Sequence, residues 1–350
     1  MIKTVALVSL SAGTIGEDFV KHEVNIGLNR LEQFGLNVKI MPNAMKGIEY
    51  TKNHPEGRAE DLLAAMRDEE VDMILCAIGG DDTYRLLPYL FENNELKDVI
   101  ENAEKKKVFL GFSDTTMNHL MLHKLGYNTF YGQSFLADVC EMEDDMLPYT
   151  KKYFEELLTT GSIEEIVPSN VWYEERSDWS VSAVGTKRKK HENEGFQLLQ
   201  GEPVFSGKIL GGCLESMYDI LDNSRYADTT SLCEKYNLFP ALEDWRGKIL
   251  LLETSEEQPN PKHYRKMLET LKATGIFKVV SGVICGKPMD ELYFDEYKKI
   301  IVEVIDNPKL SVAANINIGH ATPRCIIPFG VEAKVDVVKQ IIRFASHQKG

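Results

Sequence analysis

The chain has 350 residues, of which 43% are hydrophobic, and its 54 acidic and 40 basic residues give a net charge of −14. This length exceeds what one average domain needs, and the composition allows a large buried core. The negative field of the molecule repels nucleic-acid polymers. No stretch approaches the roughly 20 apolar residues that span a bilayer. We therefore expect a two-domain protein whose partner is neither a nucleic acid nor a membrane.

The first residues, MIKTVALVSLSAG, fit two interpretations. They resemble a secretion signal, because Lys3 precedes an apolar stretch, and they also fit a first buried β-strand. We favour the strand because later apolar runs have the same character. The cysteines form no CxxC pair and several lie in apolar runs, which indicates reduced core residues: Cys76, Cys140, Cys213, Cys233, Cys285 and Cys325. The sequence thus predicts a cytoplasmic protein.

Apolar runs rich in β-formers alternate with helical patterns through the first half of the chain. Strands are predicted at residues 4–10, 37–41, 72–78 and 107–112. Amphipathic helices are predicted between and after them, around Leu28 and Leu31, around Leu62 to Met66, and from Met117 to Leu125. This alternation is typical of a doubly wound parallel sheet, so the fold class is α/β.

The regular pattern stops between Pro168 and Pro203 and then resumes. The interrupted segment contains two tryptophans and the charge cluster KRKKHENE, a composition typical of a solvated loop. We predict three parts: an N-terminal α/β domain at 1–168, a connecting segment with an aromatic loop at 169–205, and a second α/β domain at 206–350.

The segment KVFLGFSDTT ends a buried strand in Ser113 and Asp114 and begins a helix at once. A serine on such a turn projects its hydroxyl above the sheet edge, where backbone N–H groups and the helix dipole favour a developing anion. This is the geometry of a nucleophile. The Gly-x-Ser-x-Gly pattern is incomplete because Thr115 occupies its last position. The alternative is that Ser113 or Asp114 only caps the helix.

A nucleophilic serine needs a histidine as base and an acid that orients it. His119 and His123 are one helical turn apart, but no HExxH glutamate accompanies them, so we predict no metal site. His320 ends the apolar run SVAANINIGH, and Glu253 ends KILLLE. Ligand-binding groups gather at the carboxyl ends of strands in open α/β sheets. A packing role for His320 and a solvated role for Glu253 are the alternatives.

The segment AIGGDDT ends another strand with Gly79 and Gly80. Glycines let the backbone approach a substrate closely, so an N–H near Gly80 and that of Asp114 are candidates for an oxyanion hole. GGDDT also resembles the GGDGT-type phosphate loop of nicotinamide-nucleotide and lipid kinases. Asp82 replaces the glycine that admits phosphate in that loop, and the chain has no Walker A motif, so a nucleotide kinase or nucleotide-binding protein is the alternative from another class.

GFSDTT, LLLETSEE and NIGHATP together resemble the serine-peptidase family of L,D-carboxypeptidases and microcin C self-immunity carboxypeptidases. The resemblance extends from VALVSLSA to IIPFGVEAKVD. It implies an N-terminal flavodoxin-like domain with Ser113 as nucleophile, and a C-terminal α/β domain with His320 as base and Glu253 as orienting acid. The active site is then expected at the domain interface. It further implies an oxyanion hole from the backbone of Asp114 and the Gly79-Gly80 turn, no cofactor, and a homodimer.

The length, the LETSEE segment and the aromatic insertion are more similar to the microcin-immunity branch than to the murein-recycling branch. The first branch implies hydrolysis of a peptidyl or aminoacyl nucleotide at the amide of the terminal residue, and the second implies a murein tetrapeptide. Trp179 is the first candidate to stack on the base, and Trp172 the second. The alternative for each tryptophan is that it only folds its own loop onto the domain seam. One departure from the family pattern is Cys213, which stands where asparagine is common.

Overall fold

The computed structural model describes residues 1–345, so the last five residues of the predicted second domain lie outside the described residues. The chain forms two compact units. Unit 1 contains residues 1–161, 176–187 and 231–238, and unit 2 contains 162–175, 188–230 and the chain from 239 onward. The chain therefore passes between units several times, and the boundaries at 168 and 205 stay a sequence-based prediction. Each unit is an α/β structure with its own sheet, as the fold class predicts.

Unit 1 contains a parallel sheet whose strands run in the order β5-β4-β3-β1-β2. Its strands are β1 (Thr4–Val8), β2 (Asn37–Ile40), β3 (Met73–Cys76), β4 (Val108–Gly111) and β5 (Phe130–Tyr131). The order 2-1-3-4-5 is that of flavodoxin-like sheets. β1, β3 and β4 are buried along their whole length, which explains their continuous apolar sequences. The four predicted strands are therefore confirmed.

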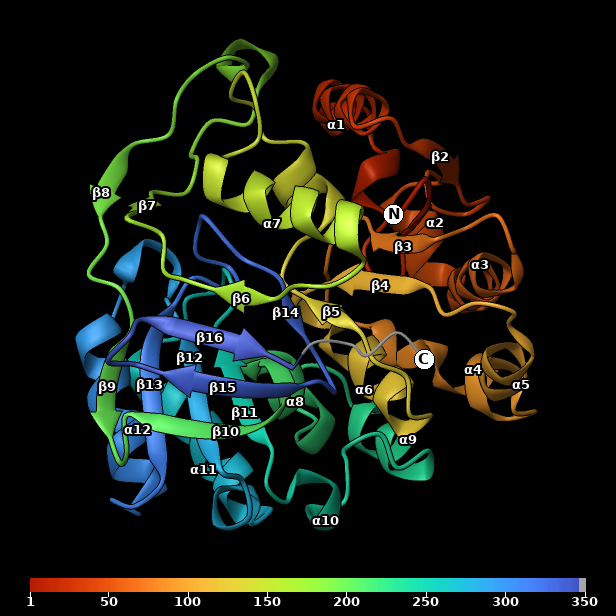
Figure 1. The fold of residues 1–350 in the computed structure, drawn as a ribbon. Coiled ribbons are helices and arrows are strands. Elements are labelled where there is room, and N and C mark those ends of the chain that lie inside the picture. Colours follow the sequence, from red (N-terminus) through yellow and green to blue (C-terminus); the bar gives the residue numbers. More distant parts are fainter. Residues whose placement is uncertain (346–350) are drawn as a thin grey trace. The chain divides into compact units, whose positions relative to one another are not determined.

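Helices connect the strands of unit 1 (Figure 1). They are α1 (Lys21–Gln33), α2 (Ile48–Asn53), α3 (Pro55–Arg67), α4 (Leu87–Phe91), α5 (Glu95–Asn102), α6 (Thr116–Lys124) and α7 (Pro148–Thr160). The three predicted helices correspond to α1, α3 and α6. Helix α6 is buried on nearly every side, which fits its lack of a polar face. Helix α9 (Thr229–Lys235) falls across a unit boundary.

Unit 2 contains a mixed sheet in the order β6-β16-β15-β10-β11-β12-β13-β9. Its centre is parallel and consists of β10 (Val204–Cys213), β11 (Ile249–Glu253), β12 (Gly282–Gly286) and β13 (Ser311–Ile316). Antiparallel strands flank this centre: β6 (Glu165–Ile166), β9 (Gln197–Gln200), β15 (Glu332–Asp336) and β16 (Ile341–Phe344). The buried parallel centre carries the polar side chains of the second half of the candidate site.

The remaining elements of unit 2 are helices and short strands outside this sheet (Figure 1). Its helices are α8 (Leu214–Leu221), α10 (Leu242–Trp245), α11 (Pro261–Ala273) and α12 (Phe294–Ile305). A separate antiparallel pair, β7 (Val171–Tyr173) and β8 (Lys190–Glu192), lies in the segment that showed no periodicity, and β14 (Ile327–Pro328) is a short strand. Within residues 1–345 the longest apolar helices are too short or too polar to cross a bilayer.

Candidate active site

Ser113 lies on a strained turn between β4 and α6 in unit 1. Its φ is +66°, in the left-handed region, which costs a non-glycine residue about 1–3 kcal/mol. Its backbone N–H donates to the hydroxyl of Tyr131 at 3.2 Å, and the Thr115 hydroxyl donates to the carbonyl of Phe112 at 2.6 Å. Hydrogen bonds from both sides of the turn therefore maintain a backbone conformation that is typical of nucleophile elbows.

Gly79 lies directly against Ser113. A β-carbon at Gly79 would lie 2.6 Å from the Ser113 Oγ and 3.3 Å from the backbone N of Asp114. Only a glycine fits at this separation. The carboxyl end of β3 and the Ser113 turn after β4 therefore meet at one edge of the unit 1 sheet, where the sequence predicts them.

Asp114 connects three strand ends through its side chain. Its carboxylate accepts a hydrogen bond from the Ser11 hydroxyl at 2.5 Å and one from the backbone N–H of Thr83 at 2.9 Å. Burial raises the pKa of Asp114 to about 7, although these hydrogen bonds favour the ionised form. Ser11 follows β1 and Thr83 follows β3, so Asp114 fixes the turn after β4 relative to both. Sequence analysis did not identify Ser11, because a lone serine after a strand has no distinguishing pattern.

The GGDDT loop contains a buried ion pair that the sequence did not reveal. The carboxylate of Asp82 lies 2.6 Å from the guanidinium of Arg58, and Arg58 is 1% exposed. Arg58 also donates to the carbonyl oxygens of Leu10 and Ser11 at 3.3 and 3.2 Å. Arg58 thus compensates the charge of the Asp82 carboxylate inside the fold and connects this loop to the end of β1.

Glu253 and His320 form a buried acid–histidine pair in unit 2. The Oε2 of Glu253 accepts from Nδ1 of His320 at 2.8 Å and from the His320 backbone N–H at 3.2 Å. Glu253 is the last residue of β11, and His320 follows β13. In catalytic triads a carboxylate in this position on Nδ1 orients the ring so that Nε2 accepts the proton. The structure thus brings together two of the three predicted catalytic side chains.

Gly319 makes this pair possible. Its φ is +84°, and a β-carbon there would lie 2.3 Å from Oε2 of Glu253. Both the backbone conformation and the space require a glycine. The glycine before His320 therefore has a defined role, which is to let the main chain close over the carboxylate.

A second carboxylate, that of Glu256, contacts the other ring nitrogen of His320. Its Oε2 lies 3.0 Å from Nε2. Burial alone would lower the pKa of His320, but the charges and hydrogen bonds of Glu253 and Glu256 raise it to about 10. The hydrogen bond to His320 lowers the pKa of Glu256 to about 2. Sequence analysis missed Glu256, because in LETSEE it is one of three acidic residues without a pattern that separates them.

Glu215 fixes the turn that follows Glu253. Its Oε1 accepts from the backbone N–H and from the hydroxyl of Ser255, both at 2.8 Å. Burial, together with the nearby charge of Glu253, raises the pKa of Glu215 to about 7. The thiol of Cys213 donates to Oε2 of Glu215 at 3.5 Å, and burial raises the pKa of this thiol well above its usual value. Cys213, the departure from the family pattern, is thus an uncharged thiol that hydrogen-bonds to the buried carboxyl group of Glu215.

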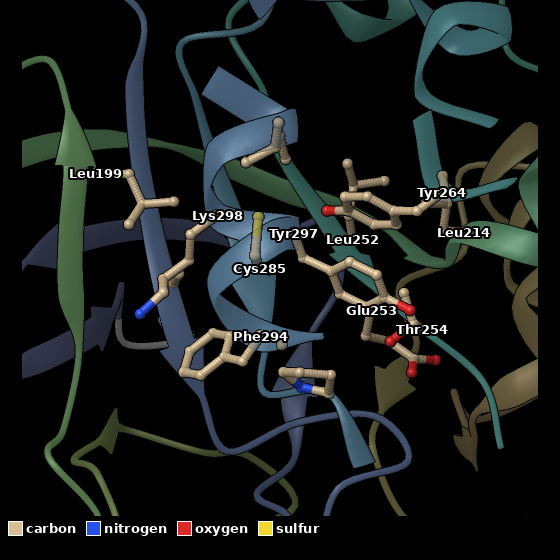
Figure 2. A pocket seen from close by; sticks show the side chains of 14 residues that line it. Leu199, Leu214, Leu252, Glu253, Thr254, Tyr264, Cys285, Phe294, Tyr297 and Lys298 are labelled. Carbon is tan, nitrogen blue, oxygen red and sulfur yellow. The ribbon is translucent and has the colours of Figure 1, made fainter. Parts of the chain in front are cut away.

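A small apolar pocket lies behind Glu253 in unit 2 (Figure 2). Figure 2 shows Glu253 and Thr254 on one side of this pocket and Lys298 on the other. The rings of Tyr264 and Tyr297 stack with centroids 4.0 Å apart. The cavity of about 20 Å³ has room for a single water molecule. This side of Glu253 is therefore packed, and we assign no ligand to the pocket.

The two candidate tryptophans lie in different environments. Trp172, in β7 of unit 2, is 8% exposed and stacks on His191 with ring centroids 4.3 Å apart. Trp179 belongs to unit 1 and is 43% exposed, and its indole N–H donates to the carbonyl of Arg176 at 3.1 Å. Arg176 is itself held by Glu141 at 2.7 Å. The Trp179 loop is therefore anchored to unit 1 with an aromatic surface exposed to solvent.

His119 has a structural position. Its Nε2 lies 3.0 Å from the carbonyl oxygen of Gly111, and its Nδ1 lies 2.7 Å from the Thr129 hydroxyl. Burial lowers the pKa of His119 to about 3, so the ring is neutral. Within residues 1–345, His, Cys, Asp and Glu side chains form no cluster of three or more suited to a metal ion.

A flavodoxin-like sheet with a serine on a strained turn, and a second α/β unit with a buried acid–histidine pair, define a two-part α/β protein of the peptidase class. Comparison with known families agrees. Residues 5–132 match the LD-carboxypeptidase N-terminal domain, and residues 206–335 match the LD-carboxypeptidase C-terminal domain. The chain belongs to the LD-carboxypeptidase family of peptidases.

Relatives of known sequence or structure fall in the same family. The structure is similar to that of an MccF-like protein from Streptococcus pneumoniae in complex with AMP, with 62% identity, 99% of each chain covered and a TM-score of 0.96. The putative carboxypeptidase YocD of Bacillus subtilis is 26% identical over 88% of this chain and 86% of its own length. The microcin C7 self-immunity protein MccF of Escherichia coli is 24% identical over 80% of this chain and 75% of its own. An MccF structure in complex with aspartyl sulfamoyl adenosine has a TM-score of 0.81 at 21% identity, covers 99% and 96% of the chains, and shares the fold.

Proposed function

We propose that the protein is a serine hydrolase that cleaves the amide between an aminoacyl residue and a nucleotide part, through an acyl-enzyme on Ser113. The observation that carries this proposal is the Glu253–His320 pair at 2.8 Å in unit 2. It is the orienting half of a triad, and the strained Ser113 turn of unit 1 is the nucleophilic half. In this proposal the two halves act together.

The reaction has two balanced steps. In the first, the Ser113 Oγ forms a bond to the substrate carbonyl carbon while Nε2 of His320 takes the hydroxyl proton. The C–N bond breaks, and the imidazolium returns that proton to the leaving nitrogen. In the second step, water attacks the acyl-enzyme with His320 again as base, which releases the amino acid and restores Ser113. Glu253 orients the ring and stabilises the imidazolium in both steps.

The backbone N–H groups of Gly80 and Asp114 are the proposed donors to the oxyanion. Gly79 supports this assignment, because its missing side chain lets the backbone after β3 approach Ser113. One donor of this kind contributes roughly 3–4 kcal/mol of transition-state stabilisation. The positive end of the dipole of α6, the helix that follows Ser113, also stabilises the oxyanion.

The nucleotide part of the proposed substrate rests on two observations. The S. pneumoniae relative, at 62% identity, holds AMP, and Trp179 exposes an aromatic face on an anchored loop. Stacking of a base on such a face contributes about 1–3 kcal/mol. Trp172 is a weaker candidate because His191 already covers its ring. A murein tetrapeptide offers no base to stack. A cytoplasmic location and a homodimeric state remain predictions.

Two measurements test the proposal. A serine-directed fluorophosphonate should label Ser113 in the wild type, and the Ser113→Ala variant should take up no label at this site, hydrolyse no substrate and unfold at the same temperature. Wild-type rates are then compared on a panel of aminoacyl sulfamoyl adenosines and on L,D-tetrapeptides. ATP binding without labelling would establish the kinase alternative. Faster hydrolysis of the tetrapeptides would establish the murein alternative.

A further inference from the structure

The resting arrangement of His320 blocks the step that the proposed function assigns to it. Both ring nitrogens contact carboxylates, Nδ1 that of Glu253 at 2.8 Å and Nε2 that of Glu256 at 3.0 Å. An imidazole that donates from both nitrogens is cationic and has no lone pair to accept a proton. Before His320 acts as a base, the Glu256 carboxylate must therefore leave Nε2.

The two carboxylates differ in how firmly they are held. The Glu253 side chain is fully buried and accepts two hydrogen bonds from His320, whereas that of Glu256 is 64% exposed on the turn after β11.

The charged neighbours of this turn are paired with one another. Glu257 on the same turn is paired with Arg225 at 2.6 Å. Arg225 also binds Asp219, and Arg324 contacts the carbonyl of His320. Among these groups, Glu256 is the exposed carboxylate beside Nε2 and can turn toward another cation.

We propose that Glu256 binds the α-ammonium group of an aminoacyl substrate and thereby releases Nε2 of His320. This inference rests on the proposed function. The α-nitrogen of an aminoacyl group lies about 2.5 Å from its carbonyl carbon. In the proposed mechanism the nucleophile approaches this carbon to roughly 3 Å and gives its proton to Nε2. A carboxylate 3.0 Å from Nε2 therefore borders the place that the proposed mechanism gives to the reacting carbonyl group and its α-nitrogen.

The exchange replaces one charge-assisted contact with another. In the resting protein Glu256 neutralises the imidazolium. In the complex Glu256 neutralises the ammonium, and the imidazolium gives its Nε2 proton to solvent water and becomes a neutral base. A substrate whose α-nitrogen is acylated carries no such charge and cannot displace the imidazolium. The substrate class that follows is an aminoacyl nucleotide with a free α-amino group, in preference to a peptidyl nucleotide.

The test compares one aminoacyl sulfamoyl adenosine, the best substrate of the wild type, with its N-acetyl derivative. Glu256→Gln removes the charge and keeps the size of the side chain. Glu257→Gln removes a charge from the same turn and serves as the matched control. We expect the wild type to prefer the free amine. Glu256→Gln should lower the ratio of kcat/KM for the free amine to kcat/KM for the N-acetyl derivative about tenfold or more. The control should retain the wild-type ratio.

A second readout separates recognition from a structural effect. In Glu256→Gln the acid limb of kcat/KM on the N-acetyl derivative should move to lower pH by about one unit, because the imidazolium loses one of its two anions. If Glu256→Gln changes both substrates equally, or if the wild type does not prefer the free amine, this inference is overturned and the proposed function stands. Failure of the wild type to hydrolyse either compound overturns the proposed function itself.

Discussion

Replacing Gly79 with alanine should lower the activity of the protein mainly by displacing Ser113. The new β-carbon would lie 2.5 Å from the Ser113 β-carbon, about 0.9 Å closer than the 3.4 Å of an ordinary contact. The φ of Gly79 is one that alanine adopts, so the clash itself must be relieved by a shift of the Ser113 turn. A displacement of about 1 Å at the reacting atom costs roughly 100-fold in rate. We therefore expect kcat to fall roughly 100-fold, equivalent to about 2.7 kcal/mol.

The assay follows kcat on an aminoacyl sulfamoyl adenosine together with the rate of fluorophosphonate labelling, which reports Ser113 directly. Both rates should fall by similar factors, while overpacking lowers the free energy of unfolding by about 1–3 kcal/mol. Gly57→Ala is the matched control, since its β-carbon meets only the Asn43 side chain, at 3.1 Å or more. Gly79→Ala with both rates within twofold of the wild type would refute the close approach on which the oxyanion assignment rests.

Three further predictions concern the other side chains of the site. Glu253→Gln should lower kcat roughly 10³-fold in the same hydrolysis assay, because the imidazole loses its orienting anion; a loss below tenfold would contradict the triad. Trp179→Ala should raise KM about tenfold or more for a nucleotide-linked substrate, and an equal effect on a tetrapeptide would argue against stacking. Glu215→Gln should stabilise the protein at pH 9 relative to pH 5 by up to about 3 kcal/mol in urea unfolding, because the pKa of Glu215 is raised from 4.5 to about 7. If this pH-dependent gain is absent, the pKa of Glu215 is not raised in the folded protein.

The sequence predicted the strand ends of the site well, and the physical reason is simple. Fully buried parallel strands leave continuous apolar runs, so the residue that ends each run marks the edge of the sheet. Ser113 after β4 and Glu253 at the end of β11 were found in this way. The family resemblance then selected them from other polar residues in similar positions.

The partners of these residues were harder to predict because tertiary folding brings them together. Ser11 and Asp114 are 103 residues apart in the chain, and Glu215 and Ser255 are 40 apart. Neither pair shows a local pattern. Glu256 lies close to Glu253 in sequence, but an exposed acidic residue in a turn is ordinarily solvated, and its contact with His320 depends on the path of a distant strand.

Solvent exposure was also beyond local prediction. Trp172 and Trp179 lie in the same aperiodic segment, and the sequence favoured Trp179 only as the first of two candidates. The antiparallel pair β7 and β8 buries Trp172 against His191. The loop of Trp179 leaves its ring 43% exposed. The pairing of β7 with β8 thus buries Trp172, while Trp179 stays exposed in a loop of the same charged segment.

Stability and catalysis favour different protonation states of the ionisable groups in the two units. Burial raises the folded-state pKa of Asp114 and of Glu215 to about 7, so the stability that their protonated forms contribute is complete below their ordinary pKa values and is lost as pH rises through 7. The pKa of His320 is also raised, so its contribution is present below its ordinary value of 6.5 and is lost as pH rises through about 10. All three groups therefore favour the folded protein at low pH, whereas a base at His320 requires the neutral ring. A substrate that draws Glu256 away lowers the pKa of His320 locally, so in the complex the ring loses its proton at a lower pH than in the free protein.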